Sequence, residues 1–117
     1  MTLAIVGSRK LDDYSIIEDA IWDLGLTSQI SFIVSGGAKG ADTLGILYAQ
    51  IHKIPYHEHL PDLETYREFS VAAKVRNTLI VNDADVLLAF WDGKSTGTKD
   101  SIDKARNQNK PVHIIKI

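Results

Sequence analysis

The stretch Ile33-Val34-Ser35-Gly36-Gly37-Ala38-Lys39-Gly40-Ala41-Asp42 decides how this chain folds. An apolar run over residues 30–34 feeds a glycine-rich turn, and a helical pattern follows at once, with apolar positions at Leu44, Leu47, Tyr48 and Ile51. A strand, a glycine-rich turn and a helix in this order are how α/β proteins bring backbone N–H groups to a phosphate. A tight strand-to-helix connection without any ligand fits the same residues.

The composition restricts the class of protein. A length of 117 residues suits one domain over 1–117 and is too short for two. The net charge of −2 argues against a general nucleic-acid-binding surface, and the absence of cysteine excludes disulfides and thiolate metal sites. The histidines have no convincing metal-ligand spacing, so we expect no metal and no cofactor. No apolar run approaches about 20 residues, so a cytoplasmic protein without a membrane span is expected.

Apolar and amphipathic segments alternate along the whole chain. The apolar runs predict five strands, at residues 2–6, 30–35, 56–60, 85–91 and 112–117. The amphipathic segments predict four helices: from an Asp12 or Asp13 cap to Leu24 before Gly25, from the glycine turn to about His52, over roughly 66–81, and over 97–109. The expected fold is therefore α/β, a single Rossmann-like, doubly wound parallel sheet of about five strands flanked by helices.

Three polar, glycine-containing loops follow strands of this sheet: Gly7-Ser8-Arg9, residues 35–42 and residues 92–98. Ligands of open parallel sheets bind beyond the carboxyl ends of the strands, so the three loops form one cleft if their strands are neighbours. Arg9 could direct its guanidinium at a phosphate or pair with a nearby aspartate. Asp42 could accept hydrogen bonds from ribose hydroxyls, orient Arg9, or serve only as a helix-start carboxylate.

Two further groups are candidates for the cleft. Arg76-Asn77, inside the third predicted helix, could reach the cleft or lie on an exposed face. Ser95-Thr96-Gly97-Thr98 offers a second anion site at the last helix, or an ordinary helix cap. Lys39 does not complete a Walker A motif, so a solvated side chain is more consistent with its position than a catalytic one.

In their order and spacing these blocks resemble the SLOG superfamily, and the YspA-like branch most closely, over essentially the whole chain. The resemblance implies a Rossmann-like fold that binds nucleotides or their derivatives in a bacterial or phage protein. More distantly, the chain is similar to the Lonely Guy phosphoribohydrolases and to the DNA-processing protein A family, which binds single-stranded DNA. The superfamily also includes sensor domains for NAD-derived signals.

One departure bears on catalysis. The catalytic glutamate of the Lonely Guy motif would fall on Ser101 here, and Asp100 is displaced by about 100° around a helix. Cleavage of a nucleotide N-glycosidic bond, with Asp42 or Asp100 as the carboxylate, therefore remains an alternative to binding alone, and the catalytic residues stay unknown. Single-stranded DNA binding is the other alternative.

The leading expectation is a protein that senses or sequesters a nucleotide-type small molecule, with nucleic acid and membrane not expected as partners and a homodimer or higher homo-oligomer possible. Phosphate would bind at the glycine turn and at residues 95–98, and Trp91 or Tyr66 would stack on a base. The expected ligand-binding residues are Gly7, Ser8, Arg9, Ser35, Gly36, Gly37, Lys39, Gly40, Ala41, Asp42, Arg76, Asn77, Trp91, Ser95, Thr96, Gly97 and Thr98.

Overall fold

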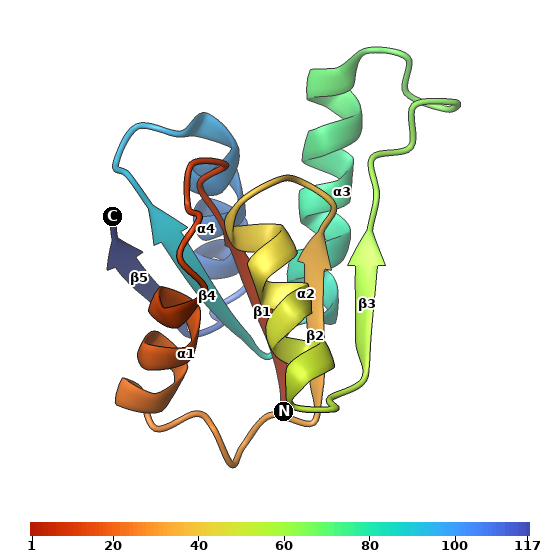
Figure 1. The fold of residues 1–117 in the computed structure, drawn as a ribbon. Helices are drawn as coiled ribbons and strands as arrows, with labels where there is room; N and C mark the ends of the chain where they lie inside the picture. The colour runs from red at the N-terminus through yellow and green to blue at the C-terminus, as the bar shows by residue number, and fades with distance from the viewer.

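The computed structural model describes residues 1–117 as five strands that alternate with four helices (Figure 1). The strands are β1 (Thr2–Gly7), β2 (Phe32–Gly36), β3 (Tyr56–His59), β4 (Val86–Trp91) and β5 (Val112–Lys116). The helices are α1 (Tyr14–Asp23), α2 (Ala41–Ile51), α3 (Phe69–Asp83) and α4 (Thr96–Asn107). All strands are parallel, in the order β3-β2-β1-β4-β5, so the predicted α/β sheet is confirmed.

The predicted boundaries of the elements hold to within three residues. Asp13 caps α1 by accepting a hydrogen bond from the Ser15 N–H at 3.0 Å. The largest difference is α3, which begins at Phe69 rather than near residue 66. The reason is a turn in which Asp62 accepts hydrogen bonds from the backbone N–H groups of Thr65 and Tyr66, through its side chain and its carbonyl respectively. These bonds hold the preceding chain outside the helix.

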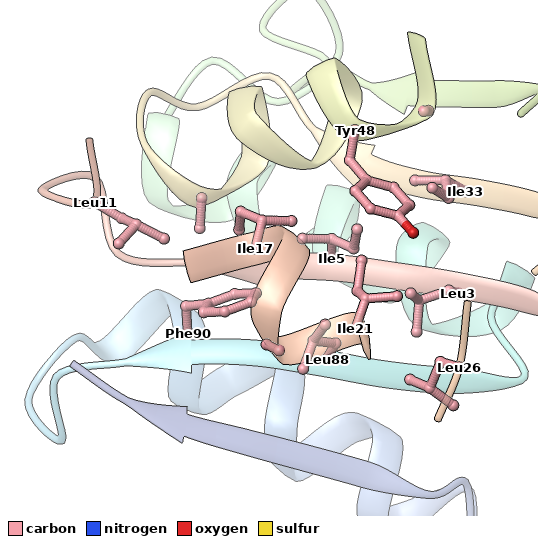
Figure 2. Close-up of a cluster of buried hydrophobic side chains, with 13 residues drawn as sticks. Leu3, Ile5, Leu11, Ile17, Ile21, Leu26, Ile33, Tyr48, Leu88 and Phe90 are labelled. Carbon is pink, nitrogen blue, oxygen red and sulfur yellow. The ribbon is translucent and has the colours of Figure 1, made fainter. Parts of the chain in front are cut away.

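Two apolar clusters, one on each face of the sheet, hold the helices in place. Alternate residues of β1 and β4 pack against α1 and α2 on the first face, together with the buried Tyr48 ring (Figure 2). The intervening residues pack against α3 and α4 on the second face, around Ile80 and Ile102. Because both faces are covered, the central strands are almost entirely apolar. None of the four helices combines the length and the hydrophobicity needed to cross a bilayer.

The order of the strands determines where a ligand site can form. The chain winds outward from β1 to β3, then returns past β1 to form β4 and β5 on its other side. The winding direction therefore reverses between β1 and β4, which is the position where open α/β sheets bind ligands. In Figure 1 the carboxyl ends of the strands point to the top of the view, and α3 rises beyond them on one side.

Candidate functional site

A cavity of about 640 Å³ lies at this reversal point, on the carboxyl side of β1 and β4. Its volume falls in the range of about 300 to 1,000 Å³ that is typical of small-molecule sites. Most of the residues that line it are polar or charged. The residues that line it are Val6, Gly7, Ser8, Arg9, Lys10, Ala38, Asp42, Phe69, Ser70, Ala73, Lys74, Arg76, Asn77, Asp92, Ser95, Thr96, Gly97, Thr98, Asp100 and Ser101.

The glycine-rich turn is attached directly to the loop that follows β1. The Ala41 N–H donates to the Ser8 carbonyl oxygen at 3.1 Å, which brings the first turn of α2 against this loop. Gly40 has a φ of +80°, and a Cβ at this position would lie 2.2 Å from the Ser8 carbonyl oxygen. Only glycine fits this crossing of two backbones. The glycine therefore serves the contact between the loops, and Gly40 itself does not line the cavity.

Asp42, in the first turn of α2, presents a buried carboxyl group to the cavity, and the residue is only 5% exposed. Burial raises its pKa from 3.8 to about 6. The guanidinium of Arg76, the backbone N–H groups of Ala38 and Gly7, and the guanidinium of Arg9 all act in the opposite direction. At pH 7 the carboxyl is thus mostly ionised. The nearby guanidinium and N–H groups do not fully compensate for the hydration that the carboxylate loses on burial.

Arg76, on α3, is 8% exposed and faces Asp42 across Gly36. The position of a Cβ on Gly36 would be 2.5 Å from Asp42 Oδ2 and 2.6 Å from Arg76 Nη1, so the missing side chain leaves room for both groups. They come close without forming an ion pair within 4.0 Å. Burial lowers the pKa of Arg76, and the Asp42 carboxylate partly offsets this.

The guanidinium of Arg76 is held by one of its three nitrogens. Its Nε donates to Asn77 Oδ1 at 3.0 Å, whereas neither Nη atom has a hydrogen-bond partner in the protein. Every fully buried side-chain polar atom in the structure is paired. The Nη atoms therefore have access to the cavity, where their N–H groups are free to donate hydrogen bonds to a ligand.

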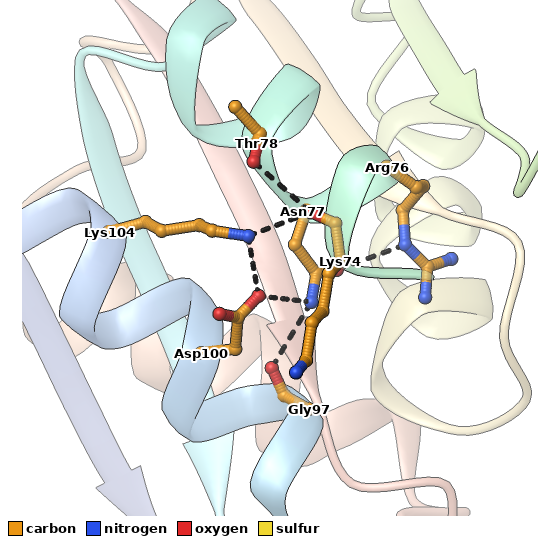
Figure 3. A network of polar contacts seen from close by, with 7 residues as sticks. All are labelled: Lys74, Arg76, Asn77, Thr78, Gly97, Asp100 and Lys104. Carbon is orange, nitrogen blue, oxygen red and sulfur yellow. Dashed lines mark hydrogen bonds and ion pairs between the residues drawn. The ribbon is translucent and has the colours of Figure 1, made fainter. Parts of the chain in front are cut away.

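Asn77 links Arg76 to α4 (Figure 3). Its amide nitrogen donates to the Gly97 carbonyl oxygen at 3.3 Å and to Asp100 Oδ2 at 3.1 Å. The same Asp100 oxygen accepts from Lys104 Nζ at 2.8 Å, so the charge of this carboxylate is neutralised within the protein. Both functional atoms of the Asn77 side chain are thus used internally.

The amino terminus of α4 opens onto the cavity. Ser95 is its N-cap residue, yet its side chain makes no capping hydrogen bond, and the first turn contains no acidic residue. The backbone N–H groups of residues 96–98 consequently lack partners within the helix. Ser101, one turn further, is 2% exposed, and its hydroxyl has no partner. Since no fully buried polar atom is unpaired, this hydroxyl also faces the cavity.

The structure brings together more than half of the residues that the sequence singled out. Ten of the predicted ligand-binding residues, and the candidate carboxylate of Asp100, line the cavity: Gly7, Ser8, Arg9, Asp42, Arg76, Asn77, Ser95, Thr96, Gly97 and Thr98. Seven predicted residues do not: Ser35, Gly36, Gly37, Lys39, Gly40, Ala41 and Trp91. Ser35 instead donates to the Ile5 carbonyl beneath the site, and the Trp91 indole donates to the Ser95 carbonyl at 3.0 Å, which anchors the loop before α4.

An apolar strip on α3 was not among the predicted site residues. Phe69 and Ala73 line the cavity on the same side of α3 as Arg76. The spacings of four and three residues between them would have identified this helical face. Tyr66, which was expected to stack on a base, precedes the helix and does not line the cavity.

Comparisons with known proteins agree with this architecture. A family model described as "YspA, cpYpsA-related SLOG family" (YAcAr) matches residues 1–66. The Gene 61 protein of Mycobacterium phage D29 is 32% identical over 115 residues, which cover 92% of this chain and 90% of the phage protein. The chain belongs to the YspA-related SLOG family. The phage relative also agrees with the bacterial or phage origin that the resemblance implies.

Two solved structures share the fold. DNA processing protein A from Streptococcus pneumoniae matches 99% of this chain with a TM-score of 0.78 and 19% identity. DNA processing protein A from Helicobacter pylori, described for a unique single-stranded DNA binding mode, matches 97% with a TM-score of 0.72 and 21% identity. The SLOG chain corresponds to 50% and 64% of these longer proteins, respectively.

Proposed function

We propose that this protein binds a nucleotide or nucleotide-derived small molecule in the cavity at the carboxyl ends of β1 and β4. The observation that carries the proposal is the buried guanidinium of Arg76, whose two Nη atoms have no partner other than what the cavity supplies. The guanidinium has lost most of its hydration by burial, and its Nη donors lack protein acceptors, so a ligand that supplies acceptors at the cavity would stabilise it. An anionic group is the natural complement.

The remaining walls favour a phosphorylated sugar over a simple anion. The open amino terminus of α4 offers unpaired N–H groups and a positive dipole end, which suit a phosphate. The Asp42 carboxylate accepts hydrogen bonds and repels anions, so it suits hydroxyl groups of a sugar. The phosphate is therefore better accommodated at α4 than at the glycine turn, where Asp42 already faces the Ala38 N–H.

Mass spectrometry of the small molecules released on denaturation tests this proposal. We expect a nucleotide derivative from the wild-type protein and its loss from Arg76→Gln, whereas Arg106→Gln, an exposed change on α4, should retain it. Recovery of a free base or a ribose phosphate would support the alternative of N-glycosidic hydrolysis, with Asp42 as the carboxylate. A protein that releases nothing and shows no thermal shift with millimolar nucleotides would contradict the proposal.

Single-stranded DNA is the second candidate ligand. It is favoured by the shared fold with DNA processing protein A, whose Helicobacter pylori form binds single-stranded DNA, and by three exposed basic residues around the cavity, Arg9, Lys10 and Lys74. The overall charge of −2 opposes it. An affinity for oligonucleotides that falls with salt, with a slope of about −0.7 for each neutralised phosphate, would support this candidate. The absence of binding at low salt would exclude it.

A further inference from the structure

The cavity has a single aromatic wall. Phe69, the first residue of α3, is the only aromatic residue that lines it, and half of its surface is exposed. The ring is not needed to close either apolar cluster of the core. An exposed phenyl ring at the mouth of a polar cavity loses hydrophobic stabilisation that a planar ligand group would recover.

Arg9 stands over this ring from the opposite loop. Its guanidinium carbon lies 5.8 Å from the ring centroid, close to the outer limit of a cation–π contact. Arg9 is exposed and has no ion-pair partner, so its planar group can move outward without breaking another contact. The two flat groups thus form a loose pair with an adjustable gap.

The spacing along α3 relates this pair to the buried part of the site. Phe69 and Arg76 are seven residues, or about 10 Å, apart on one face of the helix. Ala73 lies between them on the cavity wall, and its methyl side chain adds little bulk there. A ligand that places its anionic and sugar groups near Arg76 and Asp42 therefore extends towards Phe69 at the mouth, in the manner of a mononucleotide.

Building on the proposed function, we infer that Phe69 and Arg9 form a clamp for the base of the nucleotide, with the base between the phenyl ring and the guanidinium. Stacking on an aromatic ring tolerates any base, because each base has a π face. The clamp therefore contributes affinity for a nucleobase without selecting one. Selection of the phosphorylated sugar belongs to the deeper residues.

Parallel titrations of the four ribonucleoside 5′-monophosphates and of ribose 5-phosphate test the clamp. We expect Phe69→Ala to weaken nucleotide binding by about 5- to 150-fold, which corresponds to about 1 to 3 kcal/mol for a stacked base. Binding of ribose 5-phosphate should change less than twofold. Leu79→Ala, on the same helix with a similar exposure of 46% but outside the cavity, should leave both ligands unaffected.

A second variant separates stacking from a merely structural role. Phe69→Trp should retain nucleotide affinity, and the fluorescence of the new indole should be quenched by nucleotides and not by ribose 5-phosphate. Equal losses for both ligands in Phe69→Ala, or no loss for either, would overturn the clamp while leaving the proposed function standing. If the wild-type protein binds neither class of ligand, the proposed function fails, and the clamp with it.

Discussion

Replacing Asp42 with asparagine should make the protein more stable at neutral pH. Burial raises the pKa of this carboxyl from 3.8 to about 6, so the folded state holds the proton more tightly than the unfolded state. The stability that the protonated group provides is complete below pH 3.8 and is lost as the pH rises through 6. That difference in pKa corresponds to a loss of about 3 kcal/mol in the free energy of unfolding at pH 7 and above.

The asparagine side chain imitates the protonated carboxyl, so the variant should avoid this loss. The raised pKa already includes the attraction of Arg76 and Arg9, so their loss of an anionic partner is part of the same free-energy difference. We therefore expect Asp42→Asn to be up to about 3 kcal/mol more stable at pH 7.5, or roughly 10 °C in melting temperature. Near pH 4 the two proteins should differ little.

Urea unfolding at a series of pH values between 4 and 8 measures this difference. Asp12→Asn removes an exposed carboxylate before α1 and serves as the control, with an expected change within about 0.5 kcal/mol. The reasoning is refuted if Asp42→Asn is less stable than the wild type at pH 7.5, or if the gain does not depend on pH. A confirmed gain would indicate that the charge is retained for ligand binding at the expense of stability.

The remaining predictions concern the scaffold of the site. Gly40→Ala should lower the free energy of unfolding in urea by more than about 2 kcal/mol, because residue 40 has a positive φ and the new Cβ would clash with a facing carbonyl. Gly97→Ala should raise the free energy of unfolding by about 0.5 to 1 kcal/mol, because the space around Gly97 is open. Asn77→Ala should lower the free energy of unfolding by about 1 to 3 kcal/mol, because it leaves Arg76 Nε unpaired, and it should weaken nucleotide binding. Thr78→Ala, at the next position, should have neither effect. Equal effects within either pair would contradict these assignments.

The fold could be predicted from the sequence because each element has its own pattern. The apolar run of residues 85–91 indicates a strand buried on both faces, and it forms β4, an interior strand of the sheet between β1 and β5. The loops after β1 and β4 could be placed together because parallel strands end at a common edge. These inferences depend on periodicity and topology, which local sequence encodes.

Which side chains and backbone groups face the cavity could not be predicted in the same way. The glycines of residues 36–40 suggested a phosphate-binding turn, yet Gly36 makes room for Asp42 and Arg76, and Gly40 makes room for a neighbouring backbone. Whether a turn faces a ligand or its own protein depends on how separate loops pack. Phe69 lies within the segment predicted as the third helix, and the sequence suggests no role for it, because its position at the mouth depends on where α3 begins.

The central claim is that Arg76 completes its coordination with an anionic nucleotide-type ligand. Isothermal titration calorimetry of ribonucleoside 5′-monophosphates with the wild-type protein, Arg76→Gln and the surface control Arg106→Gln tests it most directly. We predict saturable binding by the wild type and the control, and an affinity about 10- to 150-fold lower for Arg76→Gln, as expected for a charged hydrogen bond of about 1.5 to 3 kcal/mol. Equal affinities for wild type and Arg76→Gln, or no binding by the wild type, would contradict the claim.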